Sequence, residues 1–248
     1  MRDYREETRL RVEFIRSLVE KSGCRGIVFG NSGGKDCALV GILCKMACEN
    51  TLSVMMPCGS KVNFGKDLED ARAVCEAFGI ENRMVDLSRV KEAELAALEG
   101  VAELNRAALT NVAPRLRMTT LYAIGAAEGR LVAGTGNRSE RYMGYFTKWG
   151  DGGHDFNPIS DLTVGEVYAF LRHLKAPASI IEKAPSAGLF EGQTDEAEMG
   201  VSYAAIDRYI LTGEAEEKDA AIIQRYHRAS LHKMEPIPTF EAYLAKKK

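Results

Sequence analysis

Apolar positions recur along this chain with two spacings, one typical of amphipathic helices and one of short buried strands. Residues 4–21 carry leucine, valine and isoleucine at helical spacing, so we expect an amphipathic helix that stops at Gly23. Short segments predicted as strands occupy residues 25–30, 52–56, 80–87 and 131–133. Further helices are predicted over residues 35–49, 67–77, 88–109, 111–128, 163–174, 202–212 and 216–231.

The order of these elements is strand and helix in alternation, interrupted once by the two helices within residues 88–128. Alternation of this kind predicts a parallel sheet that is covered on both faces and joined by right-handed crossovers. The expected fold class is therefore α/β, a Rossmann-like, doubly wound parallel sheet with extra C-terminal helices, in one domain over residues 1–248. The interrupting helices are candidates for a dimer interface or for simple packing against the sheet, and Pro114 suits the first turn of the second one.

Glycine and proline divide the remaining chain into loops. Residues 134–162 are predicted to be rich in loops, and residues 57–65 to form a loop at the carboxyl end of a strand. Residues 186–200 carry glycine and acidic residues with little periodicity and are predicted to form a mobile loop. Residues 234–240, with Pro236 and Pro238, are expected to run extended.

Composition narrows the class of protein. The chain has 248 residues, of which 46% are hydrophobic and 27% charged, and its net charge is −2. A balance without a broad basic surplus does not favour nucleic acid as the main partner. No apolar run approaches the length that a membrane span needs, and the charged N-terminus lacks an apolar signal region. We therefore expect a cytoplasmic protein that binds neither nucleic acid nor membrane.

The cysteines lie in the first third of the chain and form no Cys-x-x-Cys pair. Small apolar packing residues in a reducing cell are the favoured interpretation. A metal or sulfur-carrier cluster stays an alternative, although the usual spacing is missing. The residues concerned are Cys24, Cys37, Cys44, Cys48, Cys58 and Cys75.

Residues 30–37, Gly-Asn-Ser-Gly-Gly-Lys-Asp-Cys, connect a predicted strand to a predicted helix. The glycines allow backbone N–H groups to approach an anion, and the helix adds free N–H groups and the positive end of its dipole. Ser32 and Lys35 add a hydroxyl and an ammonium, and Asp36 places an acid at the edge. The segment thus predicts a phosphate cradle, the alternative being a glycine-rich turn. It matches neither the Walker A loop nor the dinucleotide fingerprint.

Two later segments extend this site. Residues 134–140, Gly-Thr-Gly-Asn-Arg-Ser-Glu, also follow a predicted strand and end in an acid. If the two strands are neighbours, Asp36 and Glu140 face each other and suit Mg²⁺; the alternative is a capped turn with a surface glutamate. In residues 145–155, Lys148 could hold a phosphate or carboxylate and Asp155 could accept from a hydroxyl or amide, the alternative being a turn with an exposed lysine.

The glycine-rich loop resembles the Ser-Gly-Gly-x-Asp-Ser loop of the ATP pyrophosphatases, with Cys37 in the place of the last serine. With the two later segments and residues 111–118, 183–189, 192–196, 200–203 and 232–233, the chain resembles the ammonia-dependent NAD synthetases over about residues 10–240. The resemblance implies a cytoplasmic homodimeric ligase of NAD biosynthesis. It would amidate deamido-NAD with ammonia through an adenylated intermediate, splitting ATP into AMP and pyrophosphate with Mg²⁺ as cofactor.

The resemblance also implies roles for particular residues, with Asp36 and Lys35 as the catalytic pair. The residues implied for ATP are Gly30, Asn31, Ser32, Gly33, Gly34, Lys35, Asp36, Cys37, Thr135 and Ser186. Those implied for deamido-NAD are Arg115, Lys148, Asp155, His232 and Lys233, and those implied for the metal are Asp36 and Glu140.

The sequence departs from the family pattern at two positions. Cys37 replaces a hydroxyl with a thiol, which is a weaker hydrogen-bonding group. Val164 stands where the family often has an ATP-binding lysine, and Lys35 or Lys183 could take over its charge. Two other functions stay open: a different ATP pyrophosphatase such as a tRNA-thiolating enzyme, which would need a basic surface and a cysteine pair, and a non-catalytic nucleotide sensor.

Overall fold

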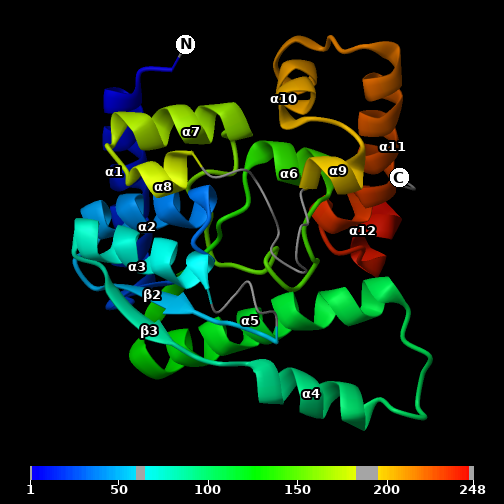
Figure 1. Ribbon diagram of the computed structural model, residues 1–248, viewed down its shortest axis with the longest axis horizontal. Helices are drawn as coiled ribbons and strands as arrows, with labels where there is room; N and C mark the ends of the chain where they lie inside the picture. The colour runs from blue at the N-terminus through cyan, green and yellow to red at the C-terminus, as the bar shows by residue number, and fades with distance from the viewer. Residues whose placement is uncertain (1, 60–64, 183–194, 246–248) are drawn as a thin grey trace.

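The computed structural model describes residues 2–59, 65–182 and 195–245. Its sheet is built from β1 (Gly26–Gly30), β2 (Thr51–Met55), β3 (Glu81–Met84) and β4 (Arg130–Ala133). The strands are all parallel, in the order β3-β2-β1-β4, and the neighbours β2 and β3 are labelled in Figure 1. Because each parallel pair needs a crossover, helices separate these strands along the chain, as the sequence predicted.

Helices occur along the whole length of the described chain. They are α1 (Tyr4–Ser22), α2 (Lys35–Ala47), α3 (Lys66–Phe78), α4 (Ser88–Ala97), α5 (Arg106–Glu128), α6 (Arg138–Met143), α7 (Val164–His173), α8 (Ala178–Ile181), α9 (Asp195–Met199), α10 (Tyr203–Thr212), α11 (Glu217–Met234) and α12 (Phe240–Ala245). Within the described residues, no helix combines the length and apolar character needed to cross a membrane.

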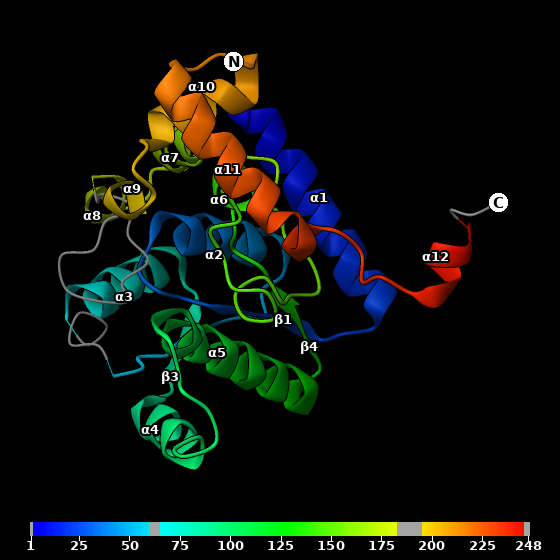
Figure 2. The same ribbon diagram turned by 90° about the vertical axis from the view of Figure 1, so that its right-hand side faces the viewer.

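Helices cover both faces of the sheet (Figure 2). On one side α2 contacts β1 and β2, with α1 and α7 packed on α2, and on the other side α5 contacts β1 and β4. Successive side chains of a strand point to opposite faces, so Ile27 and Phe29 of β1 join the core beneath α2 while Val28 joins the core beneath α5 with Leu121. This arrangement confirms the predicted doubly wound α/β fold with additional C-terminal helices.

The strand order reverses next to β1. From β1 the chain proceeds through β2 to β3 on one side, and then returns to place β4 on the other side of β1. The carboxyl ends of β1 and β4 are therefore adjacent, with Phe29 in register with Ala133. In open α/β sheets, ligands bind outside the strand ends at such a point.

The prediction of one long helix over residues 88–109 is wrong. It divides into α4, which ends at Ala97, and α5, which begins at Arg106. Gly100 lies between them with a left-handed φ of 74°, and the Asn105 side chain caps α5 by accepting from the Ala108 N–H. Pro114 consequently lies in the interior of α5 and not in its first turn. From there it faces Gly150.

Other segments predicted as irregular contain short helices. The loop-rich segment 134–162 includes α6, and residues 195–199 of the predicted mobile loop form α9, while residues 186–194 lie outside the described part. The last long helix continues to Met234, so the extended tail is shorter than predicted. Strand β3 is also shorter than residues 80–87. Helices of five or six residues give too few turns for a periodic pattern, which explains why the apolar spacing did not reveal them.

Candidate active site

The loop between β1 and α2 has a conformation that depends on glycine and on a buried asparagine. Gly33 has a φ of 73°, and a Cβ there would collide with the carbonyl oxygen of Asp67. The Gly33 N–H donates to Asn31 Oδ1 at 3.0 Å, and Asn31 Nδ2 donates to Ser53 Oγ of β2 at 3.1 Å. Gly34 is the N-cap of α2, and no side chain caps that helix. The first turn of α2 thus offers N–H groups and the positive end of a dipole, as a phosphate cradle requires.

The two acids predicted to face each other do meet beside this loop. Lys35 Nζ lies 2.7 Å from Asp36 Oδ2 and 3.7 Å from Glu140 Oε1. Glu140 is the third residue of α6 and its side chain is only 19% exposed, so it is not the surface glutamate of the alternative interpretation. The sequence predicted that these acids would face each other if their strands were neighbours. Strands β1 and β4 are neighbours, and the two acids do form a pair.

A single buried residue joins the two acids on their other side. Asn137 caps α6, accepting from the Glu140 N–H at 3.0 Å, while its own N–H donates to Glu140 Oε2. Its side-chain Nδ2 also donates to Asp36 Oδ1 at 3.1 Å. Asn137 is completely buried, so its position is fixed by packing as well as by these bonds. The residue therefore sets the spacing of the Asp36 and Glu140 carboxylates.

Burial and charge together determine the protonation of this cluster. Burial alone would lower the pKa of the Lys35 ammonium, but the charges of Asp36 and Glu140 outweigh it and raise that pKa. Burial and the neighbouring Asp36 charge raise the pKa of Glu140. The Tyr203 ring adds a further contact, since Lys35 Nζ lies 5.8 Å from its centroid. Lys35 is therefore held as a cation.

A cavity of about 840 Å³ opens in front of the cradle and the acidic pair. Its size is in the range of cofactor and nucleotide sites. The residues implied by the resemblance that line it are Gly30, Asn31, Ser32, Gly34, Lys35, Asp36, Cys37, Thr135, Glu140 and Lys233. Gly33 shapes the loop behind its wall, and Ser186 lies outside the described residues.

The cysteine at the end of the cradle is a buried packing residue. Cys37 Sγ lies 3.3 Å from the Ser32 hydroxyl, and burial raises the pKa of the Cys37 thiol. All six cysteines are free, and four of them are buried. In the described chain no group of three or more histidine, cysteine, aspartate or glutamate residues could hold a metal ion, which leaves the metal-cluster alternative without support. A protonated thiol is also a poor nucleophile, so Cys37 is poorly suited to form a covalent bond with a substrate.

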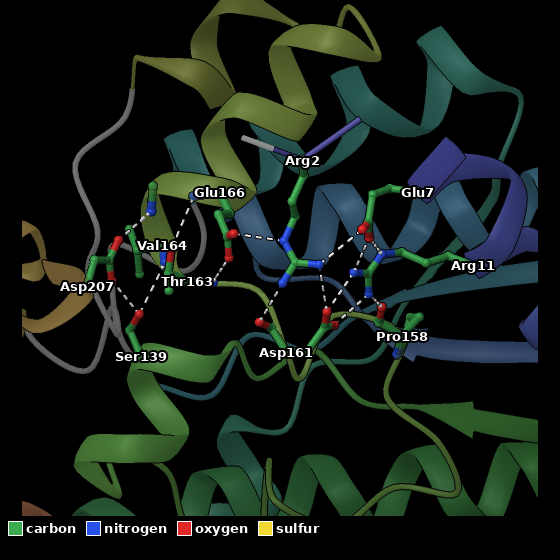
Figure 3. A network of polar contacts seen from close by, with 11 residues as sticks. Arg2, Glu7, Arg11, Ser139, Pro158, Asp161, Thr163, Val164, Glu166 and Asp207 are labelled. Carbon is green, nitrogen blue, oxygen red and sulfur yellow. Dashed lines mark hydrogen bonds and ion pairs between the residues drawn. The ribbon is translucent and has the colours of Figure 1, made fainter. Parts of the chain in front are cut away.

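The N-terminus of α7, where the family often has a lysine, is closed by side chains of this protein (Figure 3). The Val164 N–H donates to Ser139 Oγ at 3.2 Å, and the Gly165 N–H donates to Asp207 Oδ2 at 2.7 Å. Ser139 also donates to Asp207. Val164 itself is buried in an apolar cluster with Met143 and Tyr203. The site thus lacks a cation at position 164. Of the two lysines that could take over its charge, Lys35 lies against the same Tyr203 ring. The other, Lys183, lies outside the described residues.

The segment leading into α7 is anchored to the first helix by arginines (Figure 3). Arg11 forms an ion pair with Asp161 at 2.7 Å and also donates to the Pro158 carbonyl. Arg2 pairs with Glu166, whose carboxylate completes the α7 capping box with Thr163. These contacts fix the start of α7 relative to α1 and so support the wall that carries Val164.

Three of the residues implied for the second substrate, Arg115, Lys148 and His232, do not line the cavity but directly adjoin in sequence residues that do, and we call this position the rim. Arg115 donates to the Lys148 carbonyl at 3.4 Å, and Lys148 Nζ donates to the His232 carbonyl at 2.6 Å. Lys233 lines the cavity and donates to the Gly144 and Phe146 carbonyls. Arg115, Lys148 and His232 are thus connected to one another but lie outside the cavity wall.

Asp155 is separate from these residues. It accepts from the Tyr122 hydroxyl at 3.0 Å and from the Val132 N–H at 2.8 Å. The hydroxyl and the amide that Asp155 contacts here both belong to this chain, so its role towards a ligand stays a prediction. Asp155 does not line the cavity.

Sequence reasoning missed two residues that shape the site. Asn137 was included in a motif without a role, although an Asn-x-x-Glu pattern after a strand indicates a capping box. Asp151 lines the cavity, accepts from the Thr147 N–H at 2.9 Å, and has its pKa raised by burial. No spacing rule distinguishes Asp151 from an ordinary Asp-Gly turn, so only the structure could show it.

Known proteins resemble the chain over nearly its whole length. The family model described as NAD synthase matches residues 7–239. The NH(3)-dependent NAD(+) synthetase of Carboxydothermus hydrogenoformans is 45% identical over 234 residues, covering 93% of this chain and 95% of that protein. This extent of identity is evidence of shared family.

Solved structures also resemble this chain over nearly its whole length. The structure of NMN synthetase from Francisella tularensis superposes with a TM-score of 0.91 at 34% identity, covering 96% of this chain and 99% of that one. The NH3-dependent NAD synthetase of Campylobacter jejuni gives a TM-score of 0.78 at 30% identity, covering 96% and 100%. As the resemblance of its motifs predicted, the chain belongs to the NAD synthase family.

Proposed function

We propose that this chain is an ammonia-dependent NAD synthetase, a carbon–nitrogen ligase that amidates deamido-NAD with ammonia at the expense of ATP. The observation that carries this proposal is the meeting of the glycine cradle, Lys35, Asp36 and Glu140 at one end of a large cavity. Membership of the NAD synthase family and the ammonia-dependent relatives support the same reaction.

The reaction would proceed in two steps. The nicotinate carboxylate of deamido-NAD attacks the α-phosphorus of ATP, forming an acyl adenylate and releasing pyrophosphate. Ammonia then attacks the activated carbonyl carbon, and the amide forms as AMP leaves. Both steps move negative charge onto phosphate oxygens, so the protein must hold anions close together and balance their charge.

The residues of the cradle suit this task. N–H groups at the start of α2 would bind phosphate oxygens, and the Ser32 hydroxyl lies at the same wall. The Lys35 ammonium would balance charge on the departing pyrophosphate. Thr135 lies on the cavity wall after β4, where it could contact the nucleotide.

The donors present also fit Mg²⁺. Asp36 and Glu140 supply carboxylate oxygens on a shared cavity wall, which is the ligand type that this ion prefers, with substrate phosphates as further ligands. A bound Mg²⁺ would neutralise the polyphosphate and polarise its phosphorus. We therefore propose Asp36 and Glu140 as its protein ligands.

Arg115, Lys148, Asp155, His232 and Lys233 are proposed to bind the dinucleotide acid. The cationic side chains at the rim would attract its phosphates. Lys233, on the cavity wall, is the member of this set best placed to meet the part of the substrate that reacts.

A second candidate reaction is the amidation of nicotinate mononucleotide to NMN. The observation that favours it is the TM-score of 0.91 with an NMN synthetase, against 0.78 with an NAD synthetase. The two acids carry the same nicotinate carboxylate, so the same cradle would serve both. They differ by an adenylate group, which is the part that the rim residues would have to bind.

The decisive experiment offers the purified protein ATP, Mg²⁺ and ammonium with either deamido-NAD or nicotinate mononucleotide. We expect NAD and AMP to appear in equal amounts with deamido-NAD, at a kcat/KM above that for the mononucleotide. A higher kcat/KM for the mononucleotide would establish the second candidate. AMP without either amide would indicate another ATP pyrophosphatase, and tight ATP binding without turnover would indicate a nucleotide sensor.

We also infer that this chain forms one domain and acts as a homodimer in the cytoplasm. None of the residues of α4 is buried, and Val90 on it is 46% exposed, so α4 has an apolar surface available for a second copy. The six free cysteines fit a reducing compartment.

Sedimentation velocity would test the dimer. The protein should sediment as a dimer, and Val90→Glu should shift it towards monomer because a charge would be buried at the interface. Leu211→Glu, at an exposed apolar position on α10, should leave the dimer intact. A monomeric wild type would overturn the assignment.

A further inference from the structure

The ammonium of Lys35 lies in the position between Asp36 and Glu140 where a metal ion would have to bind. Its contacts are 2.7 Å to Asp36 Oδ2 and 3.7 Å to Glu140 Oε1. The side chain of Lys35 is 7% exposed, so this is a built position and not a surface ion pair. The sequence placed Lys35 in the phosphate cradle and did not predict that it would join the two acids.

The remaining oxygens of the two carboxylates are also engaged. Asp36 Oδ1 accepts from Asn137 Nδ2, and Glu140 Oε2 accepts from the Asn137 N–H. Both bonds involve a buried helix cap, whose loss would expose unsatisfied polar groups. Asp36 Oδ2 and Glu140 Oε1, the two oxygens that Lys35 contacts, are those that accept no hydrogen bond from Asn137.

Mg²⁺ binds carboxylate oxygens at about 2.0–2.1 Å. An ion at that distance from Asp36 Oδ2 would share this oxygen with an ammonium that lies 2.7 Å from it, and the two cations would repel each other. The Lys35 ammonium therefore lowers the affinity of the two carboxylates for a metal ion.

Lys35 has an alternative partner close by. It is the first residue of α2, directly after the N-cap Gly34, and it lines the cavity in front of the cradle. A phosphate bound by the first turn of α2 would lie within reach of a flexible four-carbon side chain. An anion there would attract the ammonium away from the acids.

We propose that Lys35 is a tethered counter-ion that competes with the metal for Asp36 and Glu140 until a nucleotide phosphate takes over the ammonium. The metal then binds together with the nucleotide and not before it. This inference rests on the metal role of Asp36 and Glu140 given under the proposed function. It adds that the protein alone has a low affinity for the metal because of Lys35.

The test measures binding of Mn²⁺ alone, followed by electron paramagnetic resonance, to protein without nucleotide. Lys35→Met should bind Mn²⁺ about 10–100-fold more tightly than wild type, the range seen when groups around metal ligands are changed. Lys35→Gln, which keeps a polar end, should show a gain in the same direction. Equal Mn²⁺ affinity in wild type and both variants would overturn the proposal.

A matched control is available on the same helix. Lys45 lies near the end of α2 and pairs with Glu49, so Lys45→Met removes a lysine charge without touching the acids. It should bind Mn²⁺ as the wild type does. The double variant Lys35→Met with Asp36→Asn should lose the gained affinity, and retention of it would place the new Mn²⁺ elsewhere and contradict the proposal.

A non-hydrolysable ATP analogue supplies the second half of the test. With the analogue bound to both proteins, the Mn²⁺ affinities of wild type and Lys35→Met should become nearly equal, because phosphate now holds the ammonium in the wild type. A difference between the two proteins that stayed as large as without the analogue would overturn the proposal. Absence of NAD formation would count against the proposed function alone, because these measurements do not require turnover.

Discussion

Asp36→Asn should reduce kcat/KM for ATP by about 100–1,000-fold, the loss observed when a group that stabilises charge in a transition state is removed. The amide keeps the size of the carboxylate but removes its charge. Two contacts would change, since Asp36 accepts from Lys35 at 2.7 Å and from Asn137 at 3.1 Å. The proposed metal would also lose one of its two carboxylate ligands. AMP release under saturating deamido-NAD and ammonium is the appropriate measurement.

A control for this variant is Glu49→Gln. Glu49 follows α2, pairs with Lys45 and has a side chain that is 91% exposed. The Glu49→Gln variant should therefore have the turnover and melting temperature of the wild type. If Asp36→Asn retained turnover within a few-fold of wild type, the assignment of Asp36 to the metal and catalytic site would be wrong.

Asn137→Ala should reduce both stability and activity, because Asn137 has two functions in the structure. It caps α6, and loss of an asparagine cap costs about 1 kcal/mol. Leaving buried partners unsatisfied adds about 1–3 kcal/mol, and each kcal/mol lowers Tm by roughly 2–4 °C in a chain of this size. It also orients Asp36 and Glu140, so kcat should fall by about 10–100-fold, as for other groups that orient metal ligands.

The chain contains a control that separates capping from orientation. Asn105 caps α5 with the same kind of bond, to the Ala108 N–H at 2.9 Å, but contacts neither acid. Asn105→Ala should lower the melting temperature while leaving kcat unchanged. If Asn137→Ala behaved in the same way, with full activity in the folded enzyme, the orienting role of Asn137 would be refuted. Thermal denaturation and steady-state kinetics on both variants supply the comparison.

Predictability from sequence differed between the framework of the fold and its details. Strands β1, β2 and β4 were predicted because burial on both faces of a parallel sheet produces apolar runs, and most long helices because packing of one helix face produces a repeat. Strand β3, whose residues are all exposed, is shorter than its predicted segment. The short helices α6 and α9 were missed since their ordering depends on caps and on neighbours more than on periodicity. Pro114 was placed in a first turn, but it lies within α5, where a proline is ordinarily unfavourable.

The substrate side of the site was the least predictable. Arg115, Lys148 and His232 were assigned from motifs, and the structure connects them through carbonyl contacts along the rim. Whether a charged side chain faces a cavity or a neighbouring carbonyl depends on the positions of chain segments that are distant in sequence. Lys148 and His232 illustrate this, because one belongs to a loop after α6 and the other to α11.

The sequence by itself determined the α/β class, the phosphate cradle before α2 and the family, because glycine spacing, apolar runs and ordered motifs are local properties of the chain. Only the tertiary structure decided that β1 and β4 are neighbours, that Asn137 joins Asp36 to Glu140, and that Lys35 lies between these acids. Strand order brings together residues that are about a hundred positions apart in the chain. The chemistry of the site therefore depends on contacts that no local pattern encodes.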